Sequence, residues 1–209
     1  MARFTNQAQL RYGNAVTNSN IAVGEILEVL SATKTAVRNT YGQSDTVTYI
    51  VSIVNSGTTP ITGISVTDNL GEYTFGTTTL VPLTYIDGTV KYYVNGVLQP
   101  SAVVTAGPPL VVSGITVPAG GSVTVAYEAA VNEFAPLDTT SVINNTAIVA
   151  GTGITPITAE EEITVESTPV LTITKSVSPV PVTENGTLTY TFLIQNSGNV
   201  AADASTGVV

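Results

Sequence analysis

The sequence contains no cysteine, no histidine and no tryptophan, and only 10% of its 209 residues are charged. Without cysteine, the chain has no thiol nucleophile and forms no disulfide bond. Without histidine, it lacks the imidazole that acts as a general base in many hydrolases, and it lacks the usual zinc, copper and haem ligand sets. We therefore expect a protein that is not an enzyme and that holds no metal or cofactor.

Positive charge and long apolar runs are also scarce. Six basic residues stand against fifteen acidic ones, which gives a net charge of −9. No cluster of lysine or arginine is present to neutralise phosphates or anionic headgroups, so nucleic acid and acidic membranes are not expected partners. No stretch approaches the roughly 18 apolar residues of a membrane span, and no apolar run typical of a secretion signal follows Arg3. The sequence therefore predicts no span, signal or anchor within these residues.

The residues that are abundant favour β-structure. Thr, Val, Ile, Gly, Ser, Asn and Pro dominate the chain, a composition typical of strands joined by turns. The dipeptide Asn95-Gly96, between two apolar segments, predicts a tight hairpin. Alternating or continuous apolar residues predict strands at 46–54, 61–66, 90–94, 110–115, 122–130, 141–150 and 157–165. Seven short strands without helical periodicity predict an all-β protein with an immunoglobulin-like antiparallel β-sandwich.

Parts of the sequence occur twice. Lys34, Tyr49 and the turn at 55–57 recur, with the same spacing between them, as Lys175, Tyr190 and the turn at 196–198. The beginning of the chain resembles the end of the same unit: residues 4–10 resemble 143–149, and 25–27 resemble 162–164. We therefore divide the chain into one complete repeat and two partial ones: the closing hairpin of a repeat (1–30), a complete sandwich (31–167) and the opening strands of a further repeat (168–209).

The motifs of the complete unit occur in a defined order: Thr33-Lys34, Thr48-Tyr49, Asn55-Ser56-Gly57, Val66-Thr67-Asp68-Asn69-Leu70, Val117-Pro118-Ala119-Gly120 and Asn145-Thr146-Ala147. In this order they resemble the tandem repeat known as domain of unknown function eleven, which is found in bacterial and archaeal cell-surface proteins. The resemblance covers residues 31–165 well and both flanks in part. It implies an extracellular immunoglobulin-like module on a cell or spore surface. Such proteins usually carry a signal peptide and an anchor, which are not visible here.

Three residues of the unit suggest covalent chemistry. The first and last strands of a sandwich can lie side by side, which would bring Lys34 close to Asn145. Gram-positive surface domains of related architecture join such a pair as an internal isopeptide bond. The reaction needs a neutral amine, an amide and a protonated carboxylic acid, and burial favours both protonation states. Asp68 is the first candidate for the acid and Glu128 the second. In the alternative, Lys34 extends to solvent while Asn145 and Asp68 bind nearby backbone groups.

The two partial repeats predict assembly. Two strands alone bury too little surface to be stable, and each end leaves a sheet edge unpaired. The N-terminal hairpin of one molecule is therefore expected to pack against the C-terminal strands of another, as in donor-strand complementation. Such a head-to-tail contact propagates into a filament unless it closes a ring. If the Lys and Asn pairing that the resemblance implies carries over to this homo-oligomer, Lys175 of one subunit faces Asn6 of the next.

These observations favour a structural function, with three alternatives. The favoured function is a self-assembling subunit of a fibre, pilus-like structure or surface layer. One alternative is an adhesin that binds glycan or protein through the loops at 70–84 or 99–109. Another is a spacer within a longer array of surface repeats. The last is a hydrolase that uses carboxylates alone, which the sequence does not support because no paired acids flank a cleft motif.

Overall fold

The computed structural model describes all residues except 1, 27–28, 101 and 204–209. Within these residues, no helix is long and apolar enough to cross a membrane. The described strands are β1 (Ala2–Asn6), β2 (Gln9–Tyr12), β3 (Ala15–Asn18), β4 (Ala22–Ile26), β5 (Leu30–Ala36), β6 (Thr40–Tyr41), β7 (Thr46–Asn55), β8 (Ile61–Asp68), β9 (Tyr73–Phe75), β10 (Thr78–Leu80), β11 (Leu83–Tyr85), β12 (Lys91–Val94), β13 (Val97–Leu98), β14 (Val103–Thr105), β15 (Leu110–Val117), β16 (Ser122–Val131), β17 (Val142–Ala150), β18 (Ile157–Val165), β19 (Leu171–Ser178) and β20 (Thr189–Asn196).

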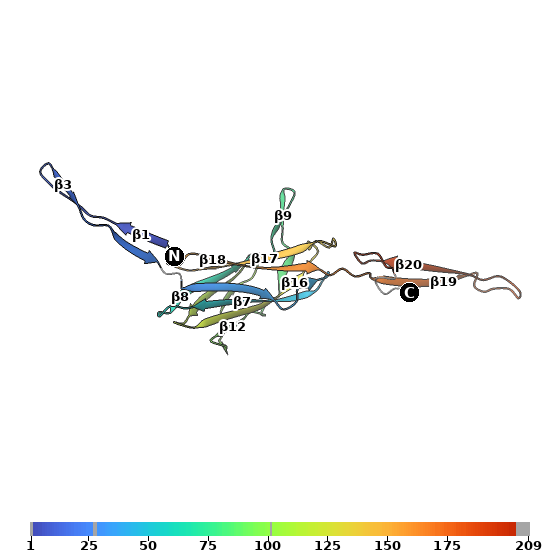
Figure 1. Ribbon diagram of the computed structural model, residues 1–209. Helices are drawn as coiled ribbons and strands as arrows, with labels where there is room; N and C mark the ends of the chain where they lie inside the picture. Colours follow the sequence, from blue (N-terminus) through green and yellow to red (C-terminus); the bar gives the residue numbers. More distant parts are fainter. Residues whose placement is uncertain (1, 27–28, 101, 204–209) are drawn as a thin grey trace.

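Two sheets make up the central sandwich (Figure 1). The first, here called the β7 sheet, has the order β13-β12-β16-β7-β5, and β11 also pairs with β16. The second, here called the β17 sheet, has the order β14-β15-β8-β17-β18-β6. Neighbouring strands in the described sheets are antiparallel except β18 and β6, which form a short parallel pair. The predicted all-β, immunoglobulin-like sandwich is thus confirmed.

The core follows from the alternation of side chains along the strands. On β7, Val47, Tyr49, Val51 and Ile53 are all fully buried, while the residues between them face outward. The β17 sheet presents its own apolar positions to the same interior, because successive side chains of a strand point to opposite faces. All seven strands predicted from the sequence are present, with ends that differ by at most two residues.

One predicted turn is confirmed, whereas two segments expected to be loops contain strands. Asn95 and Gly96 have φ angles of 49° and 79° and join β12 to β13, so the predicted tight hairpin is confirmed. By contrast, the segments expected to be loops at 70–84 and 99–109 contain the short strands β9, β10, β11 and β14. Strands of three residues show no alternation that a sequence pattern can reveal. The hairpin of β9 and β10 projects away from the sandwich (Figure 1).

The C-terminal hairpin, β19 and β20, repeats the pairing of β5 and β7. Lys175 pairs with Phe192 and Val177 with Tyr190, while Lys34 pairs with Val51 and Ala36 with Tyr49, so the two hairpins have the same register. The turns match as well. Asn196 accepts a hydrogen bond from the backbone of Gly198 and donates to Val200, as Asn55 does with Gly57 and Thr59.

The N-terminal segment forms a two-part hairpin in which β1 pairs with β4 and β2 pairs with β3. Asn6 pairs with Ala22, whereas its counterpart Asn145 pairs with Glu161, so Ala22 corresponds to Glu161. Glu25 and Ile26 therefore correspond to 164–165, so their expected match with 162–163 is wrong by two residues, and residue 27 lies outside the described residues. A shift of two residues keeps every side chain on the same face, so the pattern of the sequence cannot detect it. The two terminal hairpins extend from opposite ends of the sandwich (Figure 1).

Candidate functional site

Among the described residues, four polar or charged residues are buried in the sandwich: Lys34, Asn55, Asp68 and Asn145. Asn55 is accounted for by turns, since its amide binds the backbone of Thr59, Val117 and Pro118. The other three meet at one place in the core together with Tyr127, and we call these four residues the Lys34 cluster. A charged side chain in an apolar interior requires a partner, because the interior solvates it poorly.

Lys34 enters the core from β5. Its side chain is fully buried, and its Nζ lies 2.6 Å from Oδ2 of Asp68. The ammonium also lies 4.9 Å from the centre of the Tyr49 ring, a cation–π arrangement. Burial lowers the pKa of Lys34 from 10.5 to about 8, while the carboxylate of Asp68 and, more weakly, Glu161 oppose that decrease. The amine is therefore much easier to deprotonate than an exposed lysine.

Asp68 is the last residue of β8 and faces the interior. Its Oδ1 accepts a hydrogen bond from the backbone N–H of Leu70 at 3.0 Å, which fixes the carboxylate within its own turn. Its Oδ2 accepts hydrogen bonds from both the Lys34 ammonium and the hydroxyl of Tyr127. One oxygen thus orients the group while the other is engaged with the two neighbouring donors.

Tyr127 belongs to the centre of β16 and was not among the residues predicted from the sequence. Its hydroxyl donates to Asp68, and Nδ2 of Asn145 donates to the Tyr127 oxygen at 3.4 Å. Burial, with the Asp68 carboxylate nearby, raises the pKa of Tyr127 well above 10, so its hydroxyl stays protonated. Alternation along 122–130 places Tyr127 and Glu128 on opposite faces, a signal that could have identified it.

The prediction of Glu128 as the second candidate for the acid is wrong, because Glu128 lies on the opposite face of β16 from Tyr127. The strand β16 alternates between buried and partly exposed residues, and Tyr127 occupies a buried position while Glu128 does not. The carboxylate of Glu128 is therefore on the face of the sheet that points away from Lys34.

Asn145 reaches the cluster from β17, in the same sheet as Asp68 and in the sheet opposite to that of Lys34 and Tyr127. Its Oδ1 accepts a hydrogen bond from the backbone N–H of Gly71 at 3.2 Å. Gly71 has a φ of 75°, and a Cβ atom there would lie 2.6 Å from Cγ2 of Ile143. Glycine is therefore required for this close approach of the backbone to the amide. Lys34 and Asn145 come from β5 and β17, which belong to different sheets, and the same cluster brings them together. The last strand of the repeat, β18, does lie against the first, β5, but Asn145 is on the neighbouring strand β17.

The ring of Tyr49 closes the cluster on one side. It stacks on Tyr127 with 5.7 Å between ring centres and an angle of 24°. Its hydroxyl is buried, and no residue in the described part of the chain lies in hydrogen-bonding geometry with it. Burial raises the pKa of Tyr49, and the nearby amide of Asn145 opposes part of that rise. The Tyr49 ring thus packs against two members of the cluster, Tyr127 and Lys34.

The two residues predicted to meet between subunits lie on the terminal hairpins. Lys175 lies 4.4 Å from the centre of the Tyr190 ring and 5.4 Å from that of Phe192. Asn6 is exposed and pairs with Ala22. Since the two hairpins extend from opposite ends of the sandwich, one chain does not bring Lys175 and Asn6 together (Figure 1).

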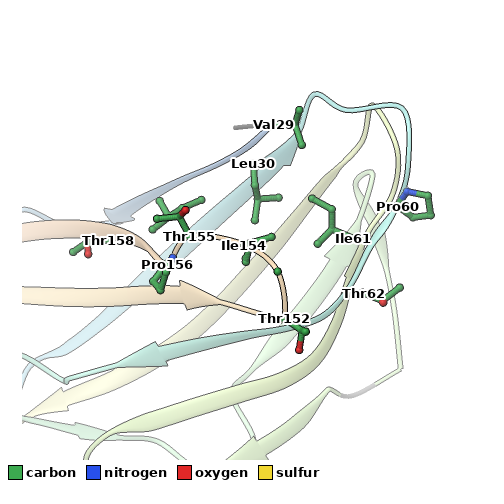
Figure 2. A pocket seen from close by; sticks show the side chains of 12 residues that line it. Val29, Leu30, Pro60, Ile61, Thr62, Thr152, Ile154, Thr155, Pro156 and Thr158 are labelled. Carbon is green, nitrogen blue, oxygen red and sulfur yellow. The ribbon is translucent and has the colours of Figure 1, made fainter. Parts of the chain in front are cut away.

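A separate groove of about 690 Å³ lies beside the start of β5. Figure 2 shows Leu30, Ile61 and Ile154 gathered in it, and the remaining lining residues are uncharged. No residue of the Lys34 cluster lines this groove. Among the residues placed by the structure, no group of three acidic side chains is arranged to hold a metal ion.

Comparison with known proteins shows the fold but not a family. No family model matches the chain. No curated protein sequence matches it either. Membership of the surface repeat family named above therefore stays a prediction.

Solved structures do resemble it. A variant of BcpA, the major pilin subunit of Bacillus cereus, is 11% identical with a TM-score of 0.53, covering 94% of this chain and 64% of that one. The major pilin SpaD from Corynebacterium diphtheriae is 16% identical with a TM-score of 0.49, covering 77% of this chain and 40% of that one. The pilus backbone RrgB from Streptococcus pneumoniae is 14% identical with a TM-score of 0.45, covering 58% of this chain and 31% of that one. The chain thus spans less than two thirds of the length of these pilins.

Proposed function

We propose that this chain is a structural subunit of an extracellular fibre, joined head to tail through its terminal hairpins. The observation that carries the proposal is the C-terminal hairpin, which has the register of β5 and β7 but leaves its core face uncovered. Phe192 is 56% exposed and Ile194 is 65% exposed, whereas their counterparts Val51 and Ile53 are fully buried. An apolar sheet face of this kind is a typical protein interaction surface.

The N-terminal hairpin supplies the complementary part. It corresponds to β17 and β18, and β18 lies against β5 within the complete repeat. Phe4, at the position of the core residue Ile143, is 57% exposed and lies across Gly24 of the paired strand. Docking of this hairpin on the C-terminal hairpin of another copy covers both apolar faces. The contact joins different surfaces of two identical chains, so it propagates in one direction.

The connection to the C-terminal hairpin suits an extended fibre. The Asn199 amide donates to the backbone oxygens of Leu137 and Glu166, at 3.0 and 3.1 Å. Both carbonyls belong to the end of the sandwich, so the hairpin is held against the complete repeat. The fold shared with a pilin subunit supports a surface location and a structural role without catalytic turnover.

We further propose that Lys34 and Asn145 become joined by an isopeptide bond. Lys34 gives a proton to Asp68, and its neutral Nζ then attacks Cγ of Asn145. The Nζ–Cγ bond forms and the Cγ–Nδ2 bond breaks, and Nδ2 takes up the proton held by Asp68 and leaves as ammonia with the electron pair. The new amide nitrogen gives its extra proton to Asp68. The bond replaces a buried charged amine by a neutral amide and ties the two sheets together, which suits a fibre under tension.

A second candidate function, an adhesin, is favoured by one observation. The hairpin of β9 and β10 projects from the sandwich, and Phe75 on it is 71% exposed. A projecting loop with an exposed aromatic side chain suits recognition of a glycan or a protein. This function is compatible with assembly into a fibre.

Negative-stain microscopy of the purified chain tests the fibre. Filaments are expected from the full chain, and deletion of residues 1–24 is expected to abolish them while the sandwich of 31–167 stays folded. Filaments that persist after the deletion overturn head-to-tail assembly. A well-folded full chain that stays monomeric favours a spacer within a longer array. Binding of glycans or proteins that is lost in Phe75→Ala supports the adhesin.

A further inference from the structure

The hydroxyl of Tyr127 lies between the acid and the leaving group of the proposed bond. Asp68 Oδ2 accepts from Tyr127, and the Tyr127 oxygen accepts from Nδ2 of Asn145 at 3.4 Å. Among the described residues, no hydrogen bond joins Asp68 directly to Asn145. The other carboxylate oxygen is occupied by the backbone of Leu70. The hydrogen-bonded route from Asp68 to the departing nitrogen therefore passes through Tyr127.

We propose that Tyr127 is a catalytic proton relay for the Lys34–Asn145 bond, and that the backbone N–H of Gly71 stabilises the oxygen of the tetrahedral intermediate. This inference depends on the isopeptide bond proposed above. It concerns two groups beyond the lysine, the asparagine and the acid, namely the Tyr127 hydroxyl and the Gly71 backbone N–H.

The protons balance as follows. Lys34 transfers one proton to Asp68 Oδ2 and attacks Asn145, whose Oδ1 gains negative charge while it accepts the hydrogen bond from Gly71. Tyr127 then gives its proton to Nδ2 and receives the proton of Asp68, so its hydroxyl is restored. Ammonia leaves with the electron pair of the Cγ–Nδ2 bond. The new amide nitrogen loses its extra proton to Asp68, which ends the reaction protonated.

The chemistry of Tyr127 suits a relay better than a base. Because it is buried beside a carboxylate, its phenol stays protonated and a free phenolate is not formed. A relay avoids that charge, since the hydroxyl gives one proton as it receives another. General acid catalysis is needed at this step because an amide nitrogen is a poor leaving group until it is protonated.

Tyr49 provides a matched control. It is fully buried, it stacks directly on Tyr127, and its hydroxyl has no hydrogen bond within the described residues. Tyr127→Phe and Tyr49→Phe therefore each remove one buried hydroxyl from adjacent rings of the same core. Only Tyr127→Phe removes the connection between Asp68 and Asn145.

The test follows ammonia loss over time by intact mass after the chain is refolded from denaturant, starting from material that has never folded. We expect wild type and Tyr49→Phe to lose ammonia at similar rates. We expect Tyr127→Phe to be slower by roughly a hundredfold, in line with the usual contribution of a general acid. Equal rates in the two variants overturn the relay and leave the bond intact. A wild-type chain that keeps its full mass overturns both the bond and the relay.

A second replacement covers the case in which Tyr127→Phe does not fold. 3,5-Difluorotyrosine at position 127 keeps the ring and the hydroxyl but makes the phenol a stronger acid. A relay predicts an altered rate of ammonia loss and an altered solvent deuterium isotope effect, neither of which a purely structural tyrosine would change. An unaltered rate and isotope effect overturn the relay.

Discussion

Replacement of Phe192 by aspartate is expected to prevent assembly without unfolding the chain. Phe192 lies on the uncovered face of the C-terminal hairpin, and its counterpart in the complete repeat, Val51, is fully buried. Complete burial of a phenylalanine contributes about 1.5–3 kcal/mol, so covering its exposed half contributes about 1–2 kcal/mol to each joint. Aspartate loses this contribution and adds the cost of burying a charge. The affinity of each joint is therefore expected to fall at least about a hundredfold.

Leu193 supplies the matched control for this prediction. It is 55% exposed, almost as much as Phe192, but it points to the opposite face of the same strand. Sedimentation velocity and negative-stain microscopy over a range of concentrations compare Phe192→Asp with Leu193→Asp. We expect short or absent filaments for the first variant and normal filaments for the second. Equal behaviour of the two variants refutes the assignment of the docking face.

Three further predictions concern the core of the sandwich. Bond formation needs one proton shared between Lys34 and Asp68. The rate of bond formation, followed by intact mass, should therefore fall once the pH exceeds the Lys34 pKa of about 8. If the amine attacked without help from the acid, the rate would instead rise through that pH. In chemical denaturation, Asp68→Ala should destabilise the chain by roughly 3–5 kcal/mol, and it should prevent ammonia loss. The double variant Lys34→Met with Asp68→Leu should recover most of the stability because it leaves no unpaired charge in the core. A double variant as unstable as Asp68→Ala contradicts this account. Gly71→Ala should lower the free energy of unfolding by about 2–4 kcal/mol, because the new Cβ combines a positive φ with contact to Ile143. Gly76→Ala has a φ of 61° but open space around it, so it should lower the free energy of unfolding by about 1–2 kcal/mol. Equal melting temperatures for the two variants argue against the close approach at Gly71.

The sequence by itself determined the strands and the repeat. Alternation with a period of two reports directly which residues of a long strand face the interior, and it predicted β7, β16 and β17 together with the sandwich. The dipeptide Asn95-Gly96 determined a turn through purely local backbone preferences. The repeated Lys, Tyr and Asn-Ser-Gly motifs located the second hairpin, whose register matches that of β5 and β7. These features are local or periodic, so they can be read from one chain.

Only the tertiary structure decided which polar residues meet. Lys34, Asp68, Tyr127 and Asn145 come from four strands in two sheets, and their contacts depend on how those sheets pack. A pattern of two-residue alternation assigns a face but not a neighbour across the core. It separates Tyr127 from Glu128, but it does not show that Tyr127 meets Asp68 and Asn145. The register of β1 and β4 was misjudged for a related reason, because a shift of two residues preserves the face. Strand pairing and sheet packing bring together residues far apart in the chain, and those contacts are what the sequence alone does not determine.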